Sequence, residues 1–217
     1  MKGLLIKDFK LMKMQKNFFI MIVVISFVVS LLTEDATFML GFITFITSLF
    51  TISTISYDEF DNGNAFLFTL PIDRKKYAVE KYVFGMLLGG CSLFLAIILA
   101  VILNLIEKSD TISNILISAV MLLPFVFLLV SIMIPFQLKF GSEKGRIAIS
   151  AALGIVFAIS FILGELAAIL GINIAEVINR ISLLGAGGLF IVIFIISMIV
   201  VLFSMKISIS VMNKKEF

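Results

Sequence analysis

The charged residues of this 217-residue chain are absent from six long stretches, at 17–33, 36–56, 82–106, 111–136, 147–164 and 181–205. A helix needs about 20 apolar residues to cross the hydrocarbon core of a bilayer, and each stretch is close to that length. Only 14% of the residues are charged and 61% are apolar, so a single soluble core of this size cannot bury them. The sequence therefore predicts an all-α membrane protein with six transmembrane helices, and it excludes a soluble enzyme, a nucleic-acid-binding protein and a secreted disulfide-bonded domain.

The segments outside these spans are too short to fold as independent domains, so we expect residues 1–217 to form a single transmembrane domain. The chain has no histidine, which removes the commonest metal ligand and general base. It also lacks the GxxxxGK[ST] loop that binds nucleotide phosphates. We therefore predict no catalytic, cofactor-binding or metal-binding residue, and a non-enzymatic role.

The basic residues indicate how the chain is oriented. Fifteen of the seventeen Lys and Arg residues fall in alternate segments, namely 1–16, 57–81, 137–146 and 206–217. Only Lys108 and Arg180 lie in the other segments. Because short cytoplasmic loops collect Lys and Arg, this asymmetry predicts a multi-pass protein with both termini in the cytoplasm.

Residues 1–16 have the pattern of a helix that lies in the membrane interface. Apolar residues cover one side of a helical wheel and Lys2, Lys7, Lys10 and Lys13 cover the other. Asp8 interrupts this pattern, as does Ile6. We predict an interfacial helix whose lysines attract anionic lipid. The alternative is a plain basic flank of the first span.

The segment 57–81 is too apolar for a solvated connector. Its apolar residues are Phe60, Phe66, Leu67, Phe68, Leu70 and Ile72. An exposed patch of this kind marks contact with a partner or with the membrane surface. Pro71 ends a first helix and Asp73 can cap a second one that continues into the third span. The alternative is a hairpin that packs against the transmembrane helices of its own chain.

Two spans carry further signals. The third span contains Gly85 and Gly89 in a GxxxG pattern, which indicates close helix packing either within the chain or between two copies. The second span concentrates hydroxyl side chains, at Thr44, Thr47, Ser48, Thr51 and Thr54. These residues are the best candidates for a polar substrate path, although such hydroxyls also bond to carbonyls of their own helix.

The loop and its flanks resemble a known family. Asp58-Glu59, then Thr69-Leu70-Pro71-Ile72-Asp73-Arg74-Lys75, then Glu80-Lys81-Tyr82 are similar to the signature of small ABC-2-type transporter permeases. The branch it resembles includes the phenol-soluble-modulin exporter and bacteriocin or lantibiotic exporters. The resemblance extends to the layout of a basic N-terminal elbow, six spans, cytoplasmic termini and no ATPase on the chain.

This resemblance implies that residues 58–70 form a coupling helix seated in an ATP-binding subunit. The implied ATPase-coupling residues are Asp58, Glu59, Phe60, Phe66, Leu67, Phe68, Leu70, Pro71, Arg74 and Lys81. A second cytoplasmic contact is implied at Glu143, Lys144 and Arg146. The family pattern further implies that 165–180 re-enters the membrane from outside.

The implied function is that of the permease subunit of an ATP-driven exporter in a bacterial cell membrane. It would move amphipathic peptides or other hydrophobic compounds together with a second permease, identical or related. ATP and Mg would bind to the separate ATP-binding subunits. Two alternatives are a substrate-binding membrane subunit of a vitamin importer and a passive membrane immunity or scaffold protein. An intramembrane enzyme is least favoured, because the spans contain no acid pair and no nucleophile beside a base.

Overall fold

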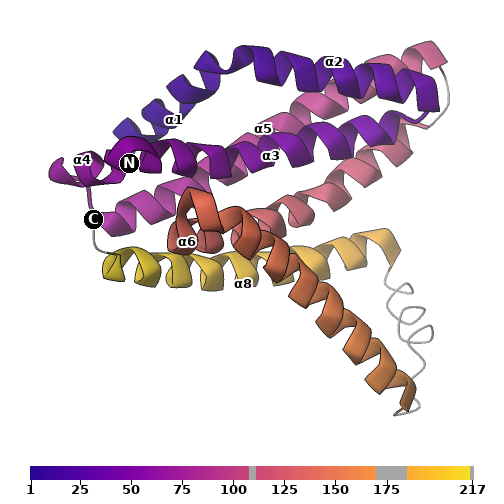
Figure 1. Cartoon of the computed structure of the whole chain (residues 1–217). Coiled ribbons are helices and arrows are strands. Elements are labelled where there is room, and N and C mark those ends of the chain that lie inside the picture. The colour runs from indigo at the N-terminus through magenta and orange to yellow at the C-terminus, as the bar shows by residue number, and fades with distance from the viewer. Residues whose placement is uncertain (108–110, 170–184, 216–217) are drawn as a thin grey trace.

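The computed structural model describes residues 1–107, 111–169 and 185–215, and every element in these ranges is helical (Figure 1). In chain order the elements are α1 (Lys2–Met14), α2 (Lys16–Thr33), α3 (Ala36–Glu59), the 3-10 helix η1 (Phe60–Asn62), α4 (Gly63–Thr69), α5 (Arg74–Glu107), α6 (Ile112–Ile169) and α8 (Gly185–Lys214). The predicted all-α class is confirmed.

Helices α2 and α3 form a tight antiparallel hairpin. Helix α2 ends at Thr33, Glu34 adopts a left-handed conformation with φ 53°, and Asp35 caps α3 by accepting a hydrogen bond from the Thr37 amide at 2.8 Å. A side-chain cap of this kind satisfies an amide that has no partner inside the helix. The connection is therefore only two residues long, as the positions of the first two predicted spans require.

Helix α3 occupies the centre of the bundle and packs against α2, α5 and α6. In an apolar stretch of 18 residues of α3, 56% of the residues are buried, whereas the corresponding share is 17% in α2 and 17% in α8. One apolar core lies toward the α2–α3 hairpin, where Met39 and Leu40 of α3 and Ala96 and Ala100 of α5 are buried together. The small alanines let the helices approach closely, which is how helices associate when lipid surrounds them.

Helix α6 consists of two arms that meet at Gly141. This glycine has φ 74° and ψ −175°, which is not helical, and only glycine adopts such a conformation without strain. The first arm packs in the bundle, whereas the second diverges from it (Figure 1). The predicted loop 137–146 is thus helical on either side of one glycine.

Five of the described helices are long and apolar enough to cross a membrane: α2, α3, α5, the first arm of α6, and α8. The chain is therefore a multi-pass membrane protein. The predicted fifth span, 147–164, lies in the second arm of α6, most of whose side chains lie outside the described residues. Of the predicted re-entrant segment 165–180, residues 165–169 continue α6 and 170–180 lie outside the described residues.

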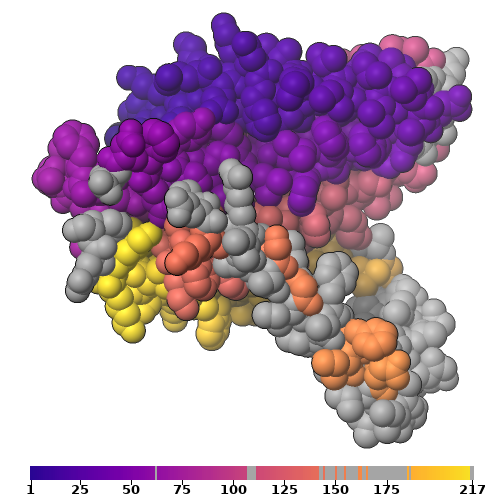
Figure 2. Space-filling view, in the orientation of Figure 1, coloured from indigo at the N-terminus to yellow at the C-terminus, as the bar shows by residue number. Residues whose placement is uncertain are grey.

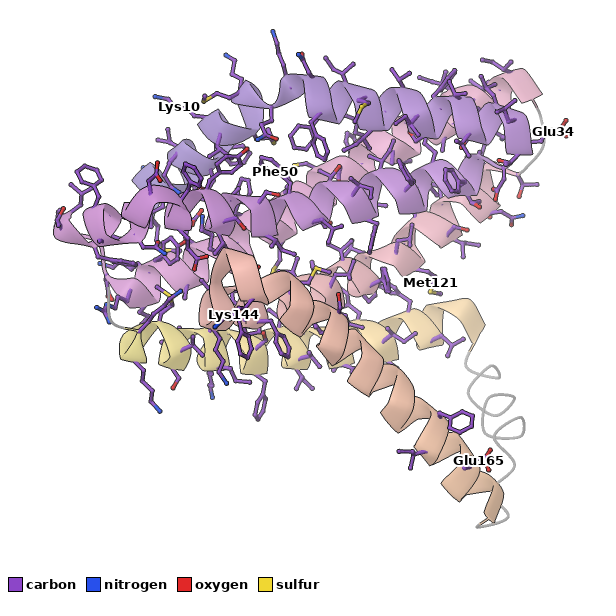
Figure 3. The ribbon with its side chains drawn as sticks, viewed as in Figure 1. Lys10, Glu34, Phe50, Met121, Lys144 and Glu165 are labelled. Atoms are coloured by element: carbon purple, nitrogen blue, oxygen red, sulfur yellow. The ribbon has the colours of Figure 1, made fainter. Side chains whose placement is uncertain are left out.

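Both termini lie at one end of the bundle, here called the terminal end, and α4 projects from that end (Figures 1 and 2). Lys10 of α1 points away from the bundle near this end, and Glu34 lies at the opposite end (Figure 3). A second apolar core sits at the terminal end, where Leu4 of α1, Ile55 of α3, Tyr77 of α5 and Met212 of α8 are buried together.

Candidate functional site

The terminal end contains a buried charge network, formed by Lys7, Asp8, Asp58 and Lys81 with the hydroxyls of Thr54 and Tyr77. The members come from three helices. Lys7 and Asp8 are adjacent on α1, Thr54 and Asp58 lie one turn apart on α3, and Tyr77 and Lys81 lie one turn apart on α5. Residues four apart share a helix face, so each of α3 and α5 presents two polar groups to the same space.

Lys81 lies at the centre of this network, and its side chain is fully buried. Its ammonium nitrogen lies 2.6 Å from Asp8 Oδ2 and 2.8 Å from Asp58 Oδ2, and it donates to Thr54 Oγ1 at 3.2 Å. A buried charge is tolerated only when it is paired and hydrogen-bonded. Lys81 meets that condition through partners on two other helices.

Asp58 receives contacts from both sides. Its Oδ2 accepts a hydrogen bond from the Tyr77 hydroxyl at 3.0 Å as well as the contact with Lys81. Its Oδ1 pairs with the ammonium of Lys7, which also lies 2.8 Å from Asp8 Oδ1. The two aspartates and two lysines therefore form a closed ring of opposite charges that joins α1 to α3 and α5.

Glu80 lies beside this ring and is also fully buried. Neither of its carboxylate oxygens accepts a hydrogen bond from the described residues, and Oε2 lies 3.8 Å from the Lys81 ammonium. A buried carboxylate without hydrogen bonds is costly, so Glu80 is a further functional candidate. It belongs to the Glu80-Lys81-Tyr82 stretch that resembles the family signature, but no pattern in the sequence distinguishes its side chain as buried.

A second polar junction joins α3, α6 and α8. The Lys215 ammonium donates to Glu59 Oε1 at 2.8 Å and to the Leu138 carbonyl at 3.0 Å. Gly141, at the break in α6, faces the same carboxylate, since a Cβ added there would lie 3.4 Å from Glu59 Oε2. The C-terminal segment is thereby attached to the end of α3 beside the point where α6 changes direction.

Arg74 connects the start of α5 to the end of α8. Its guanidinium donates to the carbonyls of Met212 and Asn213 at 3.3 Å each and of Lys215 at 2.6 Å. These carbonyls lie in the last turn of α8 and just after it, where helix carbonyls lack partners and cations are favoured. The same guanidinium lies 5.8 Å from the ring centroid of Phe68 in α4.

The predicted coupling residues fall into three groups. Asp58, Glu59, Arg74 and Lys81 have the intramolecular partners described above. Leu67 and Phe68 pack partly buried against the core of the terminal end. The remaining four point outward: Phe60 and Phe66 are each 71% exposed, Leu70 is 44% exposed, and Pro71 is exposed. Helix α4 and its flanks thus have one face held by the bundle and one apolar face that is free in this chain.

The other predicted site residues are less fully described. Lys144 is exposed just after the break in α6 (Figure 3), and the side chains of Glu143 and Arg146 lie outside the described residues. The hydroxyl residues of the predicted substrate path, Thr44, Thr47, Ser48, Thr51 and Thr54, are all buried on α3. Ser48 and Thr54 donate to carbonyls of their own helix.

The comparisons with known proteins assign the chain to a family. The family model described as ABC-2 family transporter protein matches residues 3–212. Neither a curated protein nor a solved structure matches the chain. The matched range includes nearly all of α1, the buried charge network, α4 and most of α8.

Proposed function

This chain belongs to the ABC-2 family of transporter proteins, and from that membership we propose that it is the permease subunit of an ATP-driven exporter whose ATP-binding subunits are separate chains. Family membership supports a membrane transport component. It favours this proposal over the vitamin-importer and passive-scaffold alternatives. The location proposed is a bacterial cell membrane, with a second permease copy, identical or related, completing the pathway.

The observation that carries the proposal is the exposed apolar face of α4 and η1. Phe60 and Phe66 are each 71% exposed at the terminal end, beside the polar residues of the buried charge network rather than along a lipid-facing helix. Exposed aromatic residues of this kind are typical anchors of protein interfaces. We propose that this face docks into an ATP-binding subunit, with Lys144 and its neighbours as a second contact.

The buried charge network would then act as the mechanical link. When ATP closes the ATP-binding subunits, their docking sites move and displace α4. Helix α4 follows α3 directly in the chain through η1, which contains a kink at Asp61 (φ 48°). The network ties α3 to α1 and α5 by ion pairs whose rupture would leave buried charges unpaired. Displacement of α4 is therefore transmitted to α1, α3 and α5 together. Asp58, Glu59, Arg74 and Lys81 act in this proposal as positioning residues rather than as direct contacts.

The cargo proposed is an amphipathic peptide or other hydrophobic compound. In support, α3 and α6 border a hollow of about 380 Å³ whose lining is mostly apolar, with Phe38, Phe45 and Phe125, and whose polar lining residues are Asp35, Thr37 and Thr44. Apolar lining with few polar groups is usual for sites that take hydrophobic ligands. The hydroxyl residues of α3 remain the proposed substrate path.

The docking proposal is tested by replacing both exposed aromatics. Tagged permease is purified from native membranes and the co-purified ATP-binding subunit is measured. We expect the Phe60→Ala/Phe66→Ala variant to bind about tenfold less of this subunit than the wild type, because aromatic residues contribute much of the binding energy of an interface. Phe94→Ala is the matched control, since Phe94 is 67% exposed on α5 and far from α4 in sequence. Unchanged retention by the double variant, or equal loss in the control, would contradict the proposal.

A further inference from the structure

A long groove runs along the outside of the bundle between α1, α2, α3 and α5. Its volume is about 560 Å³, within the range of about 300–1,000 Å³ that is usual for small-molecule sites. Apolar side chains form most of the lining, among them Phe19, Ile22, Ile43 and Leu88. Of the residues that the proposed transport function uses, only Thr47 is among the described lining residues of this groove.

The charged groups are confined to one end of the groove. Lys13, in the last turn of α1, and Lys16, at the start of α2, both line it. From there the lining continues along α5 through Leu87 and Cys91 to Leu95. Eight residues of α-helix rise about 12 Å, so the groove combines a cationic mouth with an apolar channel of roughly that length.

The two lysine charges are not balanced within the groove. No Asp or Glu is among its described lining residues, and the side chains of Lys13 and Lys16 are exposed. A ligand that matches this lining has a negative group next to an unbranched apolar chain. Basic residues at a membrane surface attract anionic headgroups, and apolar walls favour the acyl chain.

We propose that this groove binds one anionic phospholipid, with its headgroup at Lys13 and Lys16 and an acyl chain along Leu87 to Leu95. The lipid fills the angle between α1 and the transmembrane bundle. It therefore supports the helix that carries Lys7 and Asp8 of the buried charge network. The proposal requires only that the chain lies in a bilayer, so its failure leaves the transport function standing.

The test measures lipid retention by the purified full chain in detergent, using native mass spectrometry. The probes are phosphatidylglycerol and phosphatidylcholine with identical acyl chains. We expect the wild type to retain phosphatidylglycerol about tenfold better, and Lys13→Gln/Lys16→Gln to lose this preference. Lys2→Gln/Lys10→Gln removes the same charge from α1 at two residues that do not line the groove, and it keeps the preference. No preference in the wild type, or equal loss in both variants, overturns the proposal.

Cys91 supplies a second measurement that needs no variant. It is the only cysteine of the chain and is exposed in the groove lining. We expect phosphatidylglycerol to slow its reaction with a small maleimide at least about fivefold more than phosphatidylcholine does. Equal rates overturn the proposal. A disulfide between the Cys91 residues of two chains in oxidised native membranes also overturns it, because a second copy would then cover the groove.

Discussion

At the residue scale, Lys81 carries a positive charge into a site without solvent access. Asp8, Asp58 and Thr54 surround its ammonium within 3.2 Å. Moving these charges out of water is costly, and their mutual attraction offsets most of that cost, so the intact network adds little net stability. Removing one partner is far more destabilising, because it leaves a buried charge without compensation. The loss of Lys81 would leave two buried aspartates facing each other with only Lys7 between them.

We expect Lys81→Met to lower the free energy of unfolding by about 3–5 kcal/mol, because it leaves buried carboxylates unpaired. Denaturant unfolding of the purified protein in detergent measures this difference. Lys76→Met is the matched control, since Lys76 is exposed on the same helix and surface changes usually stay within about 0.5 kcal/mol. Equal stability of the two variants would show that the network contributes nothing to the fold.

Asp8 shows how much of this site the sequence signals. It interrupts the amphipathic pattern of 1–16, and the structure gives the reason, since Asp8 is fully buried and paired with Lys81. A charged residue on the apolar face of a predicted amphipathic helix is therefore a sign of a buried partner. Its position predicts that a cation is needed, but not which of the seventeen basic residues supplies it.

At the element scale, the GxxxG pattern of α5 forms a packing seam within the chain. A Cβ added at Gly85 would lie 3.1 Å from Thr51 Oγ1 of α3 and 3.2 Å from Val130 Cγ1 of α6. One turn later, a Cβ added at Gly89 would lie 2.4 Å from Val126 Cγ1. Both glycines allow α5 to contact α3 and α6 at once, as small residues do where membrane helices cross. Of the two predicted possibilities, packing within the chain is the one observed here.

Gly89 lies in this seam and the adjacent Gly90 does not, so the two glycines give a controlled comparison. We expect Gly89→Ala to destabilise the protein by about 1–3 kcal/mol, because the new methyl group overlaps the stiff side chain of buried Val126. Gly90→Ala meets nothing within 4 Å and is expected to be neutral or stabilising by up to about 1 kcal/mol. Thermal unfolding of both variants in one detergent measures the difference. Similar effects of both substitutions would contradict the seam.

At the scale of the whole molecule, the termini, α4 and the buried charge network share one end. The hairpin residues Glu34 and Asp35 lie at the other end. This arrangement agrees with the concentration of Lys and Arg in alternate segments of the sequence. A single orientation therefore brings every predicted coupling residue to the same side of the membrane, and the positive-inside asymmetry predicts that this side is the cytoplasm.

Accessibility labelling tests that orientation. In a Cys91→Ser background we expect Glu34→Cys to react with a membrane-impermeant maleimide on intact cells. Lys10→Cys is expected to react only after permeabilisation, because the two positions lie at opposite ends of the bundle (Figure 3). Each variant serves as the control for the other. The reverse pattern would place the terminal end outside the cell.

Much of the fold was predictable because membrane helices leave a local signal. The predicted spans 17–33 and 36–56 lie within α2 and α3, since a charge-free run of that length has few other stable conformations in lipid. The short helix after the second span was also predictable from its apolar run and Pro71. The two arms of α6 were less so, because the conformation of Gly141 depends on how α3 and α8 pack around it.

Local composition is enough to predict an all-α membrane protein with an apolar segment between its second and third spans. Which charged residues of the terminal end are buried and paired depends instead on how the helices pack. Asp8 and Lys81 are 73 positions apart, and their contact depends on the register at which α1 and α5 meet. That register is set by packing along whole helices, so no local stretch of sequence specifies it.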